Sequence, residues 1–239
     1  MTYKGSSFNG TVVHTPIAES CVDKSIHKVI NVQYLNESTF VLSIERKNVE
    51  FKAGQHFSIT PPYLGVNREY SIFSGENDER LEFLIKRVEG GVLSNQLGKL
   101  KKGDVVELSG PFGEFCLDLD LASPDQRDFL FIATGTGIAP FRSFVRTFPD
   151  IKYQLVHGVR YSREDYSLHY FDPDHVILCV SREKTSHMEG RVTKYLQGSR
   201  IKQSTNCYLC GNGSMISDSY ELLRSKGISG DQMFMEAFF

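Results

Sequence analysis

The sequence predicts an antiparallel β-domain followed by a parallel α/β domain, and three observations support this fold class. The 239 residues suffice for two domains that each bury a core of their own. Short runs of alternating apolar and polar residues fill positions 26–117, whereas apolar segments spaced about 23 to 31 residues apart follow Ser123-Pro124-Asp125. We therefore expect a domain boundary near residue 121, between domains over 26–120 and 121–239.

The expected strands of the first domain alternate apolar and polar side chains, as half-buried antiparallel strands do. They are residues 27–34, 39–45, 55–60, 81–88 and 105–108. Turn residues such as Ala53-Gly54 and Lys102-Gly103-Asp104 precede two of them. This pattern is typical of a β-barrel or a β-sandwich, and we expect one short helix over residues 93–97.

The expected elements of the second domain alternate between strand and helix, which indicates a parallel sheet. Its five apolar strands lie near Phe129, Tyr153, His175, Asn206 and Met233. The amphipathic segments between and after them are residues 139–147, 163–171, 191–197 and 214–226.

Composition excludes several classes of protein. The formal net charge of −2 argues against a nucleic-acid-binding surface, which ordinarily carries a strong basic excess. The longest apolar runs are far shorter than the roughly 18 residues of a membrane helix. Residues 1–20 lack the continuous apolar core of a secretory signal, so we expect a cytoplasmic location. Residues 1–25 are expected to form an N-terminal extension.

The five cysteines form an odd, scattered set, which favours reduced thiols over a disulfide framework. Cys207 and Cys210 have the spacing of a redox pair, but alternation along a strand points their side chains in opposite directions. The further ligands of a zinc or iron–sulfur site are absent from this segment, so we expect neither a disulfide nor a metal site.

Two motifs in the first domain are candidates for a cofactor site. Arg68 and Tyr70 fall on one face of a strand, where a cation and an aromatic ring suit an anionic planar cofactor, although an ordinary edge strand also explains them. Gly90-Gly91 permits a helix to begin at Val92 or Leu93 with N–H groups free for phosphate and Ser94 nearby, or it is a plain junction between loop and helix. Because one further strand separates these motifs, they can lie side by side.

The motif Thr134-Gly135-Thr136-Gly137 follows a strongly apolar strand and precedes Pro140, a residue suited to the first turn of a helix. Glycine there permits a close backbone approach to a diphosphate. Its spacing differs from the G-x-G-x-x-G fingerprint, so it favours a nucleotide site without indicating the standard dinucleotide fold.

Arginines follow two of the expected parallel strands, whose carboxyl ends share one edge of the sheet. They are Arg160, Arg163, Arg182 and Arg191. Any one of them could be an ordinary solvated side chain. Together they suit a phosphate monoester, because guanidinium groups bind phosphate oxygens in bidentate fashion, and thus favour NADP over NAD.

Six motifs resemble those of the ferredoxin–NADP reductase family, and they occur along the chain in the family's order. They are R-x-Y-S at 68–71, G-x-x-S at 91–94, G-P-x-G-x-F at 110–115, G-T-G-x-A-P at 135–140, S-R-E at 181–183 and C-G-N at 210–212, ahead of an acidic and aromatic terminus. The resemblance covers residues 26–239. It implies a six-stranded β-barrel that binds FAD and a five-stranded domain that binds NADP.

The resemblance also implies roles for single residues. Arg68 would pair with the FAD diphosphate, Tyr70 would stack on the flavin and Ser71 would approach its N5 or O4 atom. The diphosphate site would be completed by Gly91, Val92, Leu93 and Ser94. Phe238 would cover the flavin at a position where the family usually has a tyrosine.

For NADP, the resemblance assigns the diphosphate to one loop and the 2′-phosphate to another. The diphosphate loop is Thr134, Gly135, Thr136 and Gly137, and the 2′-phosphate group is Ser181, Arg182 and Arg191 with help from Arg160. Cys210 and Gly211 match the loop near the nicotinamide. Ser71, Cys210 and Glu236 would orient the nicotinamide against the flavin.

The resemblance implies electron transfer between NADP(H) and a one-electron carrier, a ferredoxin or flavodoxin, through bound FAD. A second hypothesis is the reductase component of an oxygenase system that uses a separate ferredoxin. The sequence carries no iron–sulfur domain, so we expect an external acceptor in both cases. A hypothesis of another class is a non-catalytic sensor that binds flavin or nucleotide.

Overall fold

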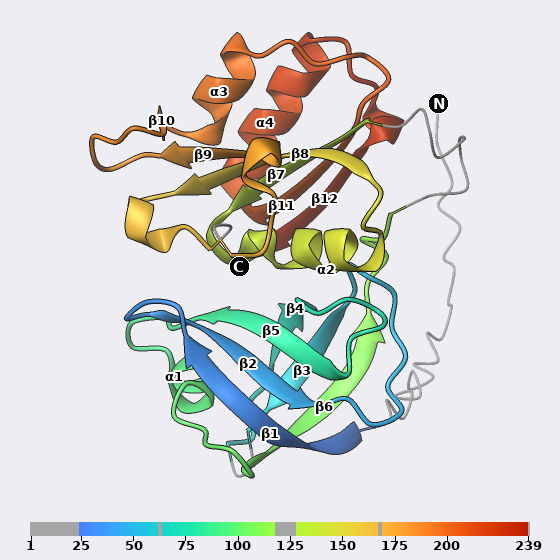
Figure 1. The fold of residues 1–239 in the computed structure, drawn as a ribbon, viewed down its shortest axis with the longest axis vertical. Helices are drawn as coiled ribbons and strands as arrows, with labels where there is room; N and C mark the ends of the chain where they lie inside the picture. Colours follow the sequence, from blue (N-terminus) through green and yellow to red (C-terminus); the bar gives the residue numbers. More distant parts are fainter. Residues whose placement is uncertain (1–23, 62–63, 118–127, 167–168, 239) are drawn as a thin grey trace, which may run out of the picture.

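The structure, a computed structural model, describes residues 24–61, 64–117, 128–166 and 169–238. It contains two six-stranded sheets, one antiparallel and one parallel. They lie one above the other in Figure 1, with helix α2 (Ala139–Thr147) between them. The expected boundary near residue 121 lies outside the described residues.

The antiparallel sheet has the strand order β4-β3-β6-β1-β2-β5. Its strands are β1 (Lys24–Tyr34), β2 (Thr39–Glu45), β3 (His56–Thr60), β4 (Arg68–Ser71), β5 (Arg80–Lys86) and β6 (Val105–Phe112). A bridge between Ile72 and Phe83 joins the two edge strands, so the sheet closes as a barrel around its own apolar core. The expected six-stranded antiparallel domain is confirmed, and helix α1 (Val92–Leu97) lies within it as predicted.

The second sheet has the order β10-β9-β8-β7-β11-β12. Its strands are β7 (Asp128–Thr134), β8 (Lys152–Val159), β9 (Val176–Val180), β10 (Met188–Glu189), β11 (Asn206–Asn212) and β12 (Met233–Phe238). The five expected parallel strands are present, but the expected total of five is wrong. The additional strand, β10, has two residues paired with β9, which is too short to leave a periodic pattern in the sequence.

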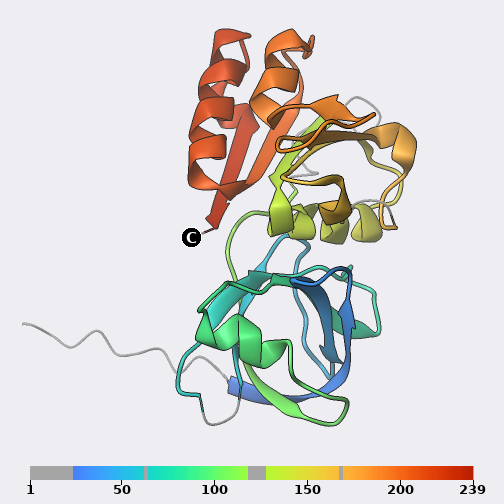
Figure 2. The ribbon, with the colours of Figure 1, turned by 90° about the vertical axis from the view of Figure 1, so that its left-hand side faces the viewer.

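Three helices pack on this sheet. Helix α2 lies on the face toward the barrel, whereas α3 (Val192–Gly198) and α4 (Gly213–Ser225) lie on the opposite face, as Figures 1 and 2 show. The two faces have separate apolar cores. Among the described residues, no helix is both long and apolar enough to cross a lipid bilayer.

The helix expected over residues 163–171 is wrong. Of this segment the structure describes 163–166 and 169–171, which contain no α-helix; a 3₁₀ turn, Ser162–Glu164, overlaps its start. Contacts with the barrel take precedence over the amphipathic pattern, because Lys86 binds Glu164 at 2.7 Å and the Tyr166 hydroxyl lies 2.9 Å from Thr39 Oγ1. The Glu164 carboxylate also accepts the Arg160 N–H group, which closes the turn.

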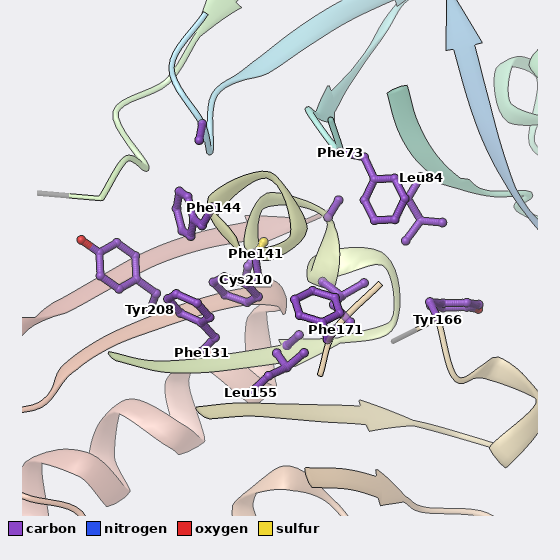
Figure 3. Close-up of a cluster of buried hydrophobic side chains, with 14 of the residues drawn as sticks. Phe73, Leu84, Phe131, Phe141, Phe144, Leu155, Tyr166, Phe171, Tyr208 and Cys210 are labelled. Carbon is purple, nitrogen blue, oxygen red and sulfur yellow. The ribbon is translucent and has the colours of Figure 1, made fainter. Parts of the chain in front are cut away.

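A continuous apolar cluster joins the two sheets. Figure 3 shows Phe73 and Leu84 of the barrel beside α2, with Phe141 packed flat on Phe131 of β7 at 4.8 Å between ring centroids. Buried Arg142 of α2 donates hydrogen bonds to the Phe73 carbonyl at 2.6 Å and to the Glu82 carboxylate at 2.9 Å. Both apolar packing and a buried charge pair therefore fix the barrel against the sheet.

Candidate functional site

A cleft of about 600 Å³ opens at the carboxyl ends of the parallel strands. The strand order reverses direction at β7 and β11, and ligands of open α/β sheets bind at such a switch point. We call this hollow the switch-point cleft. Several of the predicted site residues line it: Thr134, Gly135, Thr136, Arg160, Ser181, Arg182, Arg191, Gly211 and Phe238.

The glycines of the loop after β7 have two different functions. Gly135 has φ +55, and a Cβ atom placed there meets nothing within 4 Å, so this glycine leaves an open cradle. Gly137 is buried and does not line the cleft, because a Cβ there falls 2.3 Å from the Cys210 carbonyl oxygen. Gly211 is similarly tight, at 2.4 Å from Thr134 Oγ1. Close packing of the loop on β11 thus explains why position 137 is glycine, and an open approach to a ligand explains why position 135 is glycine.

His157 of β8 supports the same loop. Its side chain is fully buried, and Nε2 lies 3.0 Å from the Gly135 carbonyl oxygen. Burial lowers the pKa of His157, so the neutral ring donates an N–H group to that carbonyl. Sequence reasoning missed His157 because a lone histidine in an apolar strand carries no motif.

Positive charge surrounds the outer part of the cleft. The guanidinium groups of Arg160, Arg182 and Arg191 form no hydrogen bond or ion pair with any residue that the structure describes. Arg163 instead lies over the Tyr161 ring, at 4.5 Å from its centroid. Lys86 of the barrel also lines the cleft, where it is paired with Glu164 at 2.7 Å; sequence reasoning missed it because it comes from the first domain. Such an arrangement suits a ligand with more than one phosphate.

Ser71, Cys210 and Glu236, which the family resemblance groups together, do meet in the structure. The Ser71 hydroxyl donates to Glu236 Oε2 at 2.9 Å, and Cys210 Sγ lies 3.9 Å from the same oxygen. Cys210 is fully buried, and its pKa is raised well above the usual value by burial and by the Glu236 carboxylate. Cys210 is therefore a neutral thiol, suited to packing and weak donation and not to nucleophilic chemistry.

Cys207 and Cys210 belong to different cores, on opposite faces of β11. This agrees with the alternation expected from the sequence.

His56 joins this cluster and was missed by sequence reasoning. Its Nδ1 atom lies 3.4 Å from Glu236 Oε1, and its Nε2 atom lies 3.6 Å from Glu69 Oε2. The hydrogen bond with Glu236 raises the pKa of His56 above its usual value, against the opposing effect of burial. A histidine in an alternating strand gives no sign that a carboxylate from the far end of the chain will face it.

The barrel motif presents a cation beside an aromatic ring, as expected. Arg68 is exposed and donates only to the neighbouring Asn67 carbonyl at 2.7 Å among the described residues. Tyr70 is half-buried, and burial raises its pKa to about 12 although the nearby Arg68 charge opposes the rise. Its ring therefore stays neutral and can stack on a planar ligand.

The loop before α1 supplies a second cradle. Gly90 has φ +71, with nothing within 4 Å of an added Cβ atom. No side chain caps α1 at Gly91, and the Ser94 hydroxyl accepts the Val88 N–H group, which closes the loop. Val92 is exposed and Leu93 is buried. The open glycine and the uncapped turn leave backbone room and N–H groups that suit a diphosphate.

Two domain families match the chain. Residues 28–116 match the oxidoreductase FAD-binding domain, and residues 131–221 match the oxidoreductase NAD-binding domain. The first match covers the barrel and the second covers most of the parallel sheet with its cleft.

Similar proteins include a flavodoxin/ferredoxin–NADP reductase of Buchnera aphidicola, 30% identical over 82% of this chain and 88% of the relative. The electron transfer component of toluate 1,2-dioxygenase from Pseudomonas putida is 28% identical over 88% of this chain, which spans 66% of that relative's length. A solved structure of a cytochrome P450 reductase from Amycolatopsis matches with a TM-score of 0.79 and 25% identity, over 90% of this chain and 70% of that one.

Proposed function

Because the chain belongs to the ferredoxin–NADP reductase family, with an FAD-binding domain followed by an NAD(P)-binding domain, we propose that it transfers electrons between NADP(H) and a ferredoxin or flavodoxin. One observation supports this proposal above the others. The Ser71–Glu236 hydrogen bond joins the barrel motif to the strand that carries Phe238 into the switch-point cleft. A flavin held by the barrel and a nicotinamide entering from the cleft can meet at that contact.

The barrel residues fit FAD. Arg68 offers an exposed cation, Tyr70 a neutral ring face, and the loop over Gly90 and Gly91 an open cradle for the diphosphate. FAD, when bound, supplies the acceptance of a hydride and the release of its two electrons one at a time. The protein's part is to hold the cofactor and to place the nicotinamide against it.

The cleft residues fit NADPH. The open cradle at Gly135 suits the diphosphate, and the guanidinium groups of Arg182 and Arg191, which pair with none of the described residues, suit the 2′-phosphate, with Arg160 beside them. Ser181 donates its hydroxyl to the Val159 carbonyl at 3.1 Å and so fixes the loop that carries Arg182. NADH lacks the phosphate that these arginines would bind, so we expect a preference for NADPH.

Ser71, Cys210 and Glu236 would orient the nicotinamide. The Glu236 carboxylate holds the Ser71 hydroxyl in one direction, and the buried Cys210 thiol fills the space beneath it. Such fixed groups favour a near-attack geometry and exclude water from the reacting atoms. Phe238 lines the cleft from the same strand, where its ring can cover the flavin until the nicotinamide displaces it.

The first experiment is an anaerobic titration of the purified protein, monitored by its visible spectrum. We expect bound FAD that NADPH bleaches rapidly and NADH slowly, followed by reduction of added ferredoxin or flavodoxin. A protein that takes up no flavin, or whose flavin neither nucleotide reduces, contradicts the proposal.

A second candidate is the reductase component of an oxygenase system. The similarity to the toluate dioxygenase component and to the cytochrome P450 reductase favours it. The exposed Lys99, Lys101 and Lys102 offer an acidic carrier a contact in either case. Comparison of kcat/KM for flavodoxin and for ferredoxins of oxygenase systems distinguishes the two candidates, because each predicts a different preferred carrier.

A further inference from the structure

His56 lies between a partly buried carboxylate, that of Glu236, and an exposed one, that of Glu69. Its side chain is 19% exposed, that of Glu236 is 18% exposed and that of Glu69 is 69% exposed. The ring turns Nδ1 toward Glu236 and Nε2 toward Glu69. The histidine thus has one nitrogen on the inner side and one on the outer side.

These contacts extend the Ser71–Glu236 hydrogen bond to the surface. Ser71 Oγ is 2.9 Å from Glu236 Oε2, and Glu236 Oε1 is 3.4 Å from His56 Nδ1. His56 Nε2 is then 3.6 Å from Glu69 Oε2. All four side chains can give or accept a proton, and the two longer separations are ion-pair distances that a small side-chain rotation shortens to hydrogen-bond length.

Within the part of the chain that the structure describes, two carboxylates are the charged groups that act on the His56 ring. His56 pairs with Ser71 of β4 and with Phe112 of β6, whose ring centroid lies 6.0 Å away. Its charged neighbours among the described residues are Glu236 of β12 and Glu69 of β4. Gly113 leaves room for the ring, because a Cβ there falls 2.8 Å from Nδ1. The site is therefore shaped around this histidine.

We propose that His56 carries a proton between Glu236 and solvent during the oxidation of NADPH, and that it acts through Glu236 without touching the nucleotide. The inference rests on the proposed function. His56 does not line the switch-point cleft.

Protons and electrons balance as follows. Oxidation of one NADPH by two one-electron carriers gives NADP⁺, two reduced carriers and one proton, which must leave the protein. The proton released next to Ser71 binds to the Ser71 oxygen. At the same time, Ser71 transfers its own hydroxyl proton to the Glu236 carboxylate. Rotation of the carboxyl group presents that proton to His56. The O–H bond breaks as an N–H bond forms at Nδ1, and the Nε2 proton passes to water beside Glu69.

This role makes the activity depend on the ionisation of His56. Only the neutral ring can accept a proton, so kcat falls as the pH drops through the pKa of His56. The Glu236 carboxylate stabilises the charged ring, so this acidic limb lies above the usual histidine pKa of about 6.5. A purely structural role for His56 gives no such limb.

The test is the pH dependence of kcat for NADPH oxidation with an artificial acceptor, in wild type, His56→Gln and His56→Ala. We expect His56→Gln to lose the acidic limb and at least about 100-fold in kcat, the lower end of the contribution of a proton-transferring side chain, with an unchanged KM for NADPH. Added imidazole should restore kcat in His56→Ala. The control is His175→Gln, which alters an exposed histidine at the opposite edge of the sheet.

A second measurement needs no turnover. Nuclear magnetic resonance titration of the imidazole nitrogens gives the pKa of His56 in the full-length oxidised protein, and Glu236→Gln should lower it. An unchanged pKa in Glu236→Gln, or a His56→Gln variant with the wild-type acidic limb, overturns the proposal while leaving the reductase function intact. A wild-type protein without turnover overturns both.

Discussion

The Ser71 hydroxyl donates a 2.9 Å hydrogen bond to Glu236 Oε2, although 165 positions separate the two residues in the chain. Ser71 ends barrel strand β4, and Glu236 lies on β12 of the parallel sheet. The packing of one domain on the other therefore sets the direction of this hydroxyl.

Replacement of Ser71 by alanine tests that contact. We expect Ser71→Ala to lower kcat about 10- to 100-fold with little change in the Kd for NADPH, because the nicotinamide loses a fixed neighbour while the phosphate contacts remain. Stopped-flow measurement of flavin reduction gives both quantities. Ser58→Ala is the control, because Ser58 is also buried and lies on the adjacent strand β3, where it pairs with Glu69 and Ser109. Normal turnover in Ser71→Ala would refute the placement of Ser71.

Arginine 182 provides a test of nucleotide preference. Loss of a charged hydrogen bond costs about 1.5–3 kcal/mol, or roughly 10- to 150-fold in affinity. We therefore expect Arg182→Ala to weaken NADPH binding by that factor and NADH binding far less, as measured by equilibrium titration. Arg200→Ala is the control, because Arg200 lies in the hollow at the opposite edge of the sheet. Equal losses for both nucleotides would contradict a role in binding the 2′-phosphate.

The two glycines of the loop after β7 should differ in their effect on stability. Gly137→Ala places a Cβ atom 2.3 Å from the Cys210 carbonyl, and overpacking of this kind costs up to about 3 kcal/mol, or roughly 6–12 °C in Tm. Gly135→Ala strains only the backbone, at about 1–2 kcal/mol. Thermal unfolding checks the order. Gly198→Ala, where an added Cβ meets nothing within 4 Å, should not lower Tm.

The Lys86–Glu164 pair makes stability depend on pH. Burial pushes the pKa of Glu164 upward, but the bond from Lys86 and the backbone N–H groups outweigh burial and leave that pKa below its usual value. A carboxylate with a depressed pKa stabilises the folded state above its unfolded pKa of about 4.3, and this stability is lost as the pH falls through the folded value.

Glu164→Gln should therefore cost about 1 kcal/mol of unfolding free energy at pH 7, and this cost should shrink below about pH 4. Urea unfolding at pH 7, 5 and 3.5 measures it. The control is Glu37→Gln at an exposed position. A difference between wild type and Glu164→Gln that stays constant across this range would show that the ion pair has no part in it.

Periodicity predicted most of the fold, because strands and helices with one buried face repeat their apolar residues at fixed intervals. It failed at β10, which has two residues, and at residues 163–171, where Lys86 and Thr39 of the barrel hold the segment in another shape. Information about such contacts lies elsewhere in the chain, so no local pattern could reveal them.

The residues of the candidate site were likewise predicted only in part from the sequence. Contiguous motifs predicted the loop at Thr134 and the arginines that line the switch-point cleft. His56, His157 and Lys86 were not predicted, because each is a single residue whose importance depends on a partner from a distant segment. Gly137 belongs to the predicted motif, but its contact with Cys210 shows a packing requirement that the motif alone does not distinguish from ligand binding.

The buried Arg142 has a consequence for protein engineering. Its guanidinium group lies over the rings of Phe73 and Tyr170, at 4.2 and 4.6 Å from their centroids, and binds Glu82 of the barrel. A chimera that takes one half from a relative lacking either Arg142 or Glu82 leaves the remaining charge without its partner in the apolar interface between the two sheets. Such a buried, unpaired charge destabilises the folded state by several kcal/mol. Exchange of halves between members of this family therefore requires Arg142 and Glu82 to be kept together.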